Sequence, residues 1–170
     1  QVIDPQISGD IKLVGDIDGD SYPDLVIGGI INEKLNWYRY PTWEKSVIAV
    51  PTVEFTTDGA LGDVNGDGSL DIVVPDGDGQ NNLVWFQNPM PAQDPGGNLA
   101  WSRQVIGTIG SWGKDIELAD FDSDGRLDVA TRSHDAVMIY FQTAPNQWER
   151  VDLSSPSLGS EGMTSGDIDR

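Results

Sequence analysis

Oxygen-bearing side chains recur in this chain at a spacing that suits a hard metal cation. In the segment from Asp16 to Asp24, aspartates stand at positions 1, 3, 5 and 9 of nine residues. Ca²⁺ takes about six to eight oxygen ligands and tolerates irregular geometry, whereas Mg²⁺ demands a strict octahedron. Zn²⁺ would call for His or Cys, and neither lies near these segments. The spacing therefore predicts a calcium loop.

The loop is repeated. Complete copies run over 63–71 and 120–128, and a fourth copy opens at Asp167 and Asp169, with Arg170 where the other copies have Gly or Ser. The predicted ligands are the side chains at positions 1, 3, 5 and 9 and the backbone carbonyl at position 7. They are Asp16, Asp18, Asp20, Tyr22 and Asp24 in the first loop, Asp63, Asn65, Asp67, Ser69 and Asp71 in the second, and Asp120, Asp122, Asp124, Arg126 and Asp128 in the third.

Two other interpretations of these loops are weaker. An EF-hand shares aspartates at positions 1, 3 and 5 but needs a Glu at position 12 and flanking helices. Position 12 is Ile27, Val74 or Thr131, and the flanks are rich in β-formers. A single acidic loop would as readily be a solvated turn, but three copies in phase with the surrounding strands disfavour that reading. Asn65 brings a neutral oxygen, so the second loop is expected to bind its cation more weakly.

The elements that must position these loops are short strands. Each repeat carries one apolar run before the loop, a stronger one after it, an aromatic run, and a run that begins at a Trp. The expected strands are 11–14, 24–28, 35–40 and 43–48; 59–62, 71–75, 83–87 and 101–106; 115–119, 128–131, 137–142 and 148–153; and a further one at 162–165. The aromatic runs are aligned on Trp37, Trp85 and Tyr140.

Four antiparallel strands in a repeat of about 45 residues are typical of a β-propeller blade. We therefore expect an all-β fold, a β-propeller segment of four-stranded antiparallel blades. Its expected parts are the tail of a preceding blade (1–10), three full blades (11–56, 57–110 and 111–158) and the first strand of a further blade (159–170). Residues 87–98 of the second repeat, which are rich in Pro and Gly, are expected to form an exposed connection.

Composition narrows the choice of partner and compartment. The 170 residues carry 28 acidic and 10 basic side chains, a formal net charge of −18. That charge argues against a nucleic-acid partner, which needs a basic face. The absence of cysteine rules out disulfides, and no apolar run approaches the length of a membrane span. Calcium loops of modest affinity fill in millimolar extracellular calcium, which favours a secreted or cell-surface location.

The pattern resembles the FG-GAP/VCBS repeat family of calcium-binding β-propellers. The resemblance is carried by Gly15–Asp20 followed by Asp24–Gly29, and by the counterparts at 62–74 and 119–130. It implies Ca²⁺ at the aspartates of the three complete loops, and a propeller that closes with further blades or by self-association. Members include integrin α-chain propellers, propeller lectins and propeller domains of polysaccharide-active enzymes. The resemblance thus implies a lectin-like or adhesive module that binds glycans or proteins.

The sequence is compatible with three functions. A binding module would use exposed aromatic side chains, and Trp112 is the best candidate because it falls outside the repeat and is flanked by Gly; the other five tryptophans recur and are expected to pack between blades. A propeller domain of a polysaccharide lyase or sugar dehydratase would use the single histidine, His134, beside Arg132 and Asp135, although a polar hairpin turn is the plainer interpretation. An architectural surface protein would assemble through its open edges.

Overall fold

The part of the chain that the computed structural model describes contains twelve strands in three sheets. The structure describes residues 2–5, 9–29, 34–50, 55, 58–76, 81–97, 100–134, 136–154 and 162–167. The strands are β1 (Ile11–Gly15), β2 (Asp24–Gly28), β3 (Leu35–Arg39) and β4 (Glu44–Ala49); β5 (Ala60–Gly62), β6 (Asp71–Asp76), β7 (Asn82–Gln87) and β8 (Ser102–Thr108); and β9 (Gly113–Ala119), β10 (Asp128–Ser133), β11 (Val137–Ala144) and β12 (Gln147–Ser154). The described residues contain no helix that is long and apolar enough to cross a membrane.

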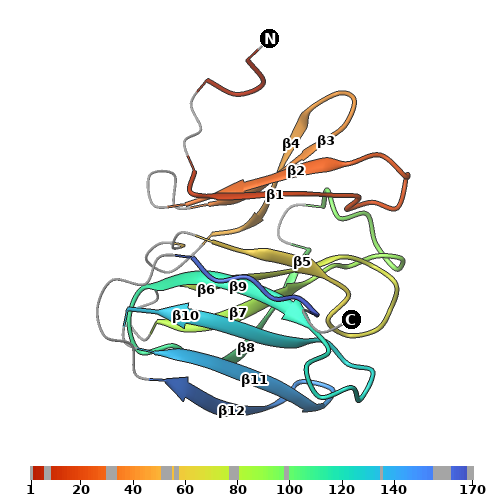
Figure 1. Ribbon diagram of the computed structural model, residues 1–170. Coiled ribbons are helices and arrows are strands. Elements are labelled where there is room, and N and C mark those ends of the chain that lie inside the picture. Colours follow the sequence, from red (N-terminus) through yellow and green to blue (C-terminus); the bar gives the residue numbers. More distant parts are fainter. Residues whose placement is uncertain are drawn as a thin grey trace.

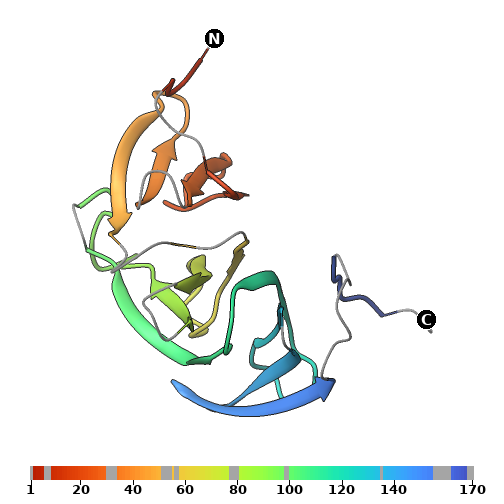
Figure 2. The same cartoon turned by 90° about the vertical axis from the view of Figure 1, so that its left-hand side faces the viewer.

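Each sheet is an antiparallel meander. The strand orders are β1-β2-β3-β4, β5-β6-β7-β8 and β9-β10-β11-β12, and neighbours in each order pair antiparallel. The sheets stack face to face (Figure 1) and fan out along an arc, with β1, β5 and β9 on its inner side and β4, β8 and β12 on its outer side (Figure 2). This arrangement confirms the all-β fold of four-stranded antiparallel blades, and each sheet is called a blade below.

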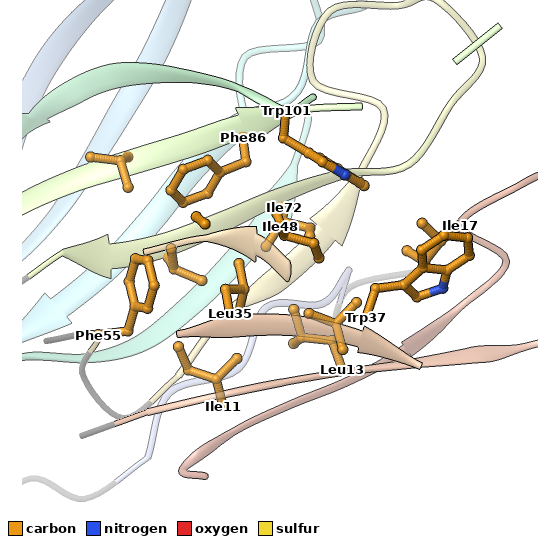
Figure 3. Close-up of a cluster of buried hydrophobic side chains, with 14 residues drawn as sticks. Ile11, Leu13, Ile17, Leu35, Trp37, Ile48, Phe55, Ile72, Phe86 and Trp101 are labelled. Carbon is orange, nitrogen blue, oxygen red and sulfur yellow. The ribbon is translucent and has the colours of Figure 1, made fainter. Parts of the chain in front are cut away.

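Apolar side chains fill the two spaces between neighbouring blades. The first core joins Trp37, Leu35 and Ile48 of blade 1 to Ile72 and Phe86 of blade 2 (Figure 3). The second core joins Trp85, Leu83 and Val73 of blade 2 to side chains of blade 3 such as Val129 and Tyr140. Because the side chains of a strand alternate between its two faces, each central strand of blade 2 contributes to both cores.

Two glycines let the blades approach closely at the start of the loops. A Cβ built on Gly15 would lie 2.7 Å from a methyl group of Leu61, and one built on Gly62 would lie 2.7 Å from a methyl group of Leu118. Leu61 and Leu118 each belong to the following blade. A side chain at either glycine would therefore force neighbouring blades apart.

The pairing of strands corrects one alignment made from the sequence. Val26 pairs with Trp37 and Val73 with Trp85, but the equivalent partner in blade 3, opposite Ala130, is Ile139. Tyr140 pairs with Val129 instead, and it faces blade 2, where its hydroxyl donates to the carbonyl of Thr108 (2.6 Å). A shift of one residue moves a side chain to the opposite face of a sheet. Trp37 and Trp85 therefore face the following blade, whereas Tyr140 faces the preceding one.

Three further expectations differ from the structure. Residues 162–167 form no strand, because no neighbouring strand pairs with them in the described part of the chain, although Ser165 donates to Glu117 of β9 (3.1 Å). Residues 2–5 are also outside any strand, and Asp4 instead accepts hydrogen bonds from Tyr38 and Lys45 (both 2.9 Å). Of the five tryptophans expected in the cores, Trp37, Trp85 and Trp101 are buried and the half-buried Trp148 packs against the second core, whereas Trp43 is half-buried and belongs to neither core.

The connection at 87–98 is not simply exposed. Within its described residues, Pro95 is buried and its carbonyl accepts a hydrogen bond from the indole of Trp101 (3.1 Å). Asp94 lies 4.0 Å from the guanidinium of Arg39 in blade 1, and a Cβ built on Gly96 would lie 3.4 Å from the ring of Trp37. The connection therefore folds back over the preceding blade.

Candidate metal centres

The three acidic loops occupy the same place in each blade, between its first and second strands. Their backbones have the same unusual turns, because positions 4 and 6 have positive φ angles in all three loops. Those residues are Gly19 (φ 76°) and Ser21 (72°), Gly66 (75°) and Gly68 (90°), and Ser123 (64°) and Gly125 (89°). Two left-handed residues in nine coil the chain tightly enough to turn alternate side chains inward.

Backbone amides inside each loop bind its carboxylates. In loop 1, Asp16 accepts from the amides of Asp20 (3.0 Å) and Ser21 (2.7 Å), and Asp20 accepts from the amide of Tyr22 (2.9 Å). Asp18 accepts from the amide of Asp20 (3.2 Å). Loops 2 and 3 repeat all four bonds at 2.9–3.2 Å. The side chains at positions 1, 3 and 5 are thus held in place by the loop itself.

The aspartate at position 9 has a different task, which is to clamp the loop to the third strand. Asp71 is fully buried and accepts from the amide of Val64 at position 2 (3.0 Å) and from the amide of Asn88, just beyond β7 (2.8 Å). Asp24 binds Ile17 and Tyr40 in the same way, and Asp128 binds Phe121 and Gln142, at 2.8–3.2 Å. Each position-9 carboxylate therefore connects three parts of its blade.

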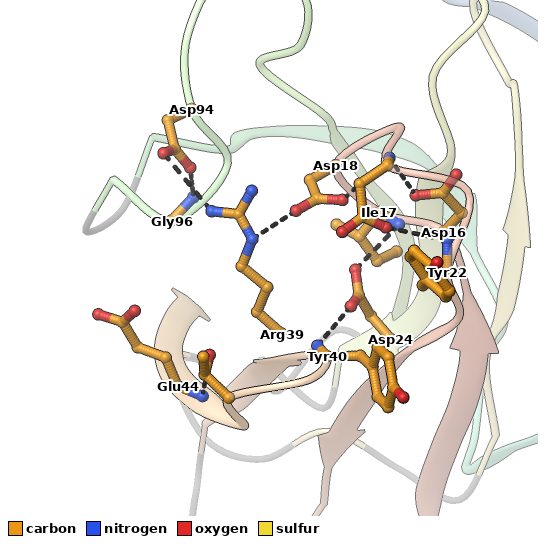
Figure 4. Close-up of polar contacts among 12 residues, drawn as sticks. Asp16, Ile17, Asp18, Tyr22, Asp24, Arg39, Tyr40, Glu44, Asp94 and Gly96 are labelled. Carbon is orange, nitrogen blue, oxygen red and sulfur yellow. Dashed lines mark hydrogen bonds and ion pairs between the residues drawn. The ribbon is translucent and has the colours of Figure 1, made fainter.

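Two loops bring three carboxylates close enough to share one cation. One oxygen from each of Asp16, Asp18 and Asp24 lies within 4.8 Å of the others, and the same holds for Asp120, Asp122 and Asp124. Figure 4 shows the first group converging on one side of the loop. Hard carboxylate oxygens at these separations suit Ca²⁺. Loop 2 has no such group of three because Asn65 stands at position 3, and its amide nitrogen donates to Asp67 (2.8 Å).

Burial makes the negative charge in these loops costly. Desolvation raises the pKa of Asp71 to about 7, against the opposing effect of the amides of Asn88 and Val64. Desolvation also raises the pKa of Asp128, and that of Asp18, where the guanidinium of Arg39 acts in the opposite direction. A bound cation would favour the charged form of each carboxylate. A cation bound beside these three carboxylates would therefore relieve part of that electrostatic cost.

Arginines already neutralise part of that charge. The guanidinium of Arg39, at the end of β3, lies 2.5 Å from Asp18 Oδ2 (Figure 4). In loop 3, the side chain of Arg126 forms an ion pair with Asp124 and donates to the carbonyl of Gln142 (2.6 Å). The loop pattern predicts only a backbone carbonyl ligand from Arg126 and predicts no role for Arg39, so the ion pairs of both guanidinium groups were missed.

The remaining candidates from the sequence lie apart from one another. Trp112 is 40% exposed, as an outward contact requires. His134 is exposed in the turn between β10 and β11. The guanidinium of Arg132 forms an ion pair with Asp115 of β9 (2.6 Å). Asp135 and Asp169 lie outside the described residues, and Asp167 lies in the segment after blade 3.

A cleft of about 440 Å³ separates loops 1 and 2. Its walls combine carboxylates of both loops with apolar side chains from the following blade and the connection at 87–98: Asp16, Ile17, Asp67, Leu70, Met90 and Pro91. The ring of Tyr22, at position 7 of loop 1, lies 5.5 Å from that of Tyr40, whose ring in turn lies 5.4 Å from that of Trp43. Aromatic side chains thus gather at loop 1 as well as carboxylates.

Comparison with known proteins agrees with this geometry. A family model described as an FG-GAP-like repeat matches residues 16–74 and again residues 63–131. Each match runs from the first aspartate of one loop to the strand after the next loop. A search of curated proteins returned no match.

Proposed function

Because the chain belongs to the FG-GAP-like repeat family, we propose that it is a calcium-binding β-propeller module that acts outside the cell and binds glycans or proteins. The observation that carries the proposal is the threefold repetition of the acidic loop, two copies of which bring three carboxylates within 4.8 Å of one another. FG-GAP repeats are commonly extracellular, and millimolar calcium there suits sites of modest affinity. We assign a propeller segment with blades at 11–56, 57–110 and 111–158, flanked by parts of neighbouring blades at 1–10 and 159–170.

The cations would be structural. The proposed ligands in each loop are the side chains at positions 1, 3, 5 and 9 and the carbonyl at position 7, with Tyr22, Ser69 and Arg126 supplying the carbonyls. A cation bound only by the folded loop stabilises the folded state through mass action. The expected order of affinity places loop 1 above loop 2, since Asn65 offers a neutral oxygen.

Two places on the molecule are candidates for the ligand surface. The cleft between loops 1 and 2 and the exposed ring of Trp112 support a role in binding, since clefts with a few polar groups among apolar side chains are typical of ligand sites. Aromatic rings at such a surface offer apolar faces on which a sugar ring can stack.

Two measurements test the proposal. Calorimetric titration of metal-free protein with Ca²⁺ should show binding at up to three sites, and it should be lost in stages when Asp20, Asp67 and Asp124 are changed to Ala. If the titration gives only the heat of diluting Ca²⁺ into buffer, the proposal that the protein binds calcium is rejected. A glycan array probed with the Ca²⁺-loaded protein should show binding that weakens on Trp112→Ala; an array blank for every sugar would leave protein ligands as the partner class.

A further inference from the structure

A chain of hydrogen bonds joins the three loops across the blade boundaries. It runs through the residue whose backbone amide binds the position-9 aspartate, which is Asn88 just beyond β7 in blade 2 and Gln142 near the end of β11 in blade 3. The backbone amide of each binds the position-9 aspartate of its own blade, as described above. The side-chain amide reaches into the loop of the preceding blade. Neither residue is part of the repeated loop pattern.

The side chain of Asn88 is fully used. It is 1% exposed, and its amide nitrogen donates to the carbonyl of Ile17 in loop 1 (2.9 Å) and to that of Leu70 (3.1 Å). Its oxygen accepts from the amide of Met90 (3.0 Å). A buried amide with every group paired has one orientation. Asn88 therefore holds loop 1 from outside its own blade.

Gln142 repeats the contact one blade further on. It is 4% exposed, and its side-chain nitrogen donates to the carbonyl of Val64 in loop 2 (3.1 Å). Ile17 and Val64 both stand at position 2, between the proposed ligands at positions 1 and 3. The amide of each binds the position-9 aspartate of its own loop. The position-2 residue thus has its N–H bound to the position-9 aspartate and its C=O bound to the following blade. These two bonds fix the backbone between the proposed ligands at positions 1 and 3.

Loop 3 lacks this support in the described part of the chain, where no following blade donates to Phe121 at its position 2. The side chain at position 1 is exposed in loop 3 (Asp120), whereas it is half-buried in loops 1 and 2 (Asp16 and Asp63). Among the residues that the structure describes, loops 1 and 2 are thus each held by a side chain of the following blade.

We propose that Asn88 and Gln142 are positioning residues that set the cation affinity of the loop in the preceding blade and couple successive sites energetically. The inference rests on the proposed function, since it concerns the affinity of the same loops. Neither residue supplies a ligand atom to the loop that it positions. A cation in loop 2 would bind Asp71, which accepts from the amide of Asn88, and the side chain of Asn88 holds Ile17 in loop 1. Binding at one loop would therefore favour the bound shape of the loop in the preceding blade.

The test measures loop 1 alone. In a full-length background with Asp67→Ala and Asp124→Ala, which disables loops 2 and 3, Ca²⁺ affinity is measured by calorimetry with and without Asn88→Ala. We expect a loss of about tenfold, the equivalent of one buried hydrogen bond. Asn88→Gln, which copies its counterpart in blade 3, is expected to stay within about threefold of the background. Gln104→Ala, an amide on β8 outside this network, is the matched control.

The outcomes separate the two proposals. An unchanged affinity on Asn88→Ala, or a Gln variant as weak as the Ala variant, would overturn the positioning role while leaving the calcium module intact. A background protein that binds no Ca²⁺ at loop 1 would reject both. Amide hydrogen exchange without metal gives a second readout, because loss of the contact should speed exchange at Ile17 selectively; a uniform change across blade 1 would overturn the proposal.

Discussion

The guanidinium of Arg126 forms an ion pair with Asp124, two residues earlier in the third acidic loop. A cation at this loop must compete with that positive charge. We therefore expect Arg126→Ala to raise the Ca²⁺ affinity of loop 3 by about two- to fivefold, the range of an exposed ion pair. The measurement is a calorimetric titration with loops 1 and 2 disabled by Asp20→Ala and Asp67→Ala. Arg150→Ala, which removes an ion pair to Asp152 in β12, should have no effect; a weaker loop 3 would contradict the prediction.

The buried clamp at position 9 should matter for folding even without metal. Asp71→Ala would leave the amides of Val64 and Asn88 without their acceptor, and a buried unpaired amide costs about 1–3 kcal/mol. We expect the free energy of unfolding in chelator to fall by about 2–5 kcal/mol, measured by urea denaturation. The exposed Asp67→Ala in the same loop should cost less than about 1 kcal/mol. Equal losses would show that the clamp has no special role.

Left-handed positions that lack glycine offer a stabilising substitution. Ser123 has a φ of 64°, which costs a residue with a Cβ about 1–2 kcal/mol. Ser123→Gly should therefore raise the free energy of unfolding by about 0.5–1 kcal/mol, after the greater freedom of glycine in the unfolded chain is subtracted. Gly125→Ala, at a φ of 89° with no atom near the added Cβ, should do the reverse. A thermal melt of both variants in chelator checks the signs.

Asp58 should make stability depend on pH away from the metal loops. It accepts from the amide of Ile116 across the boundary between blades 2 and 3 (3.0 Å). Desolvation raises the pKa of Asp58, aided by Asp115 and Glu117 and opposed by backbone amides. A raised pKa means that the folded state binds the proton more tightly, so this stabilising contribution is present at low pH and is lost as pH rises above 3.8 through the folded pKa.

Asp58→Asn removes that loss because the amide stays neutral and keeps an oxygen for Ile116. The variant should be more stable than the parent at pH 7, and the difference should shrink toward pH 4. Denaturant melts across this range in chelator provide the test. A difference that is constant with pH would assign the effect to packing instead of charge.

Removal of metal should destabilise the whole module. Chelation of calcium-loaded protein is expected to lower the melting temperature by several degrees or more, since each filled loop contributes binding free energy to folding. Added Ca²⁺ should restore the melt and Mg²⁺ should do so poorly. A melt that is the same in excess chelator would contradict a structural role for the cation.

Local pattern made the loops and most strands predictable from the sequence. The ligand spacing, the turns at Gly19 and Gly125 and the strands around them all follow from chemistry within a few residues. The contacts between blades did not follow. Asn88 and Gln142 are different residue types, and the strand pairing that equates them is not visible in the sequence. Tyr140 was aligned by its ring chemistry, whereas the pairing of β10 with β11 decides which way it faces.

Side chains that fold back were equally hidden. Arg126 stands at a position where the repeat constrains only the backbone, so its ion pair with Asp124 could be found only from coordinates. Residues 162–165 have the composition of a strand, but a strand also needs a partner, and composition does not supply one.

The amides that bind the loop carboxylates have a kinetic consequence. In loop 1, backbone hydrogen bonds already orient the carboxylates of Asp16, Asp18 and Asp20. The loop therefore does not have to fold around an arriving ion. Capture would then be limited by how fast the ion sheds water, and calcium exchanges its hydration shell far more readily than magnesium. The loop would favour calcium by speed of entry as well as by strength of binding.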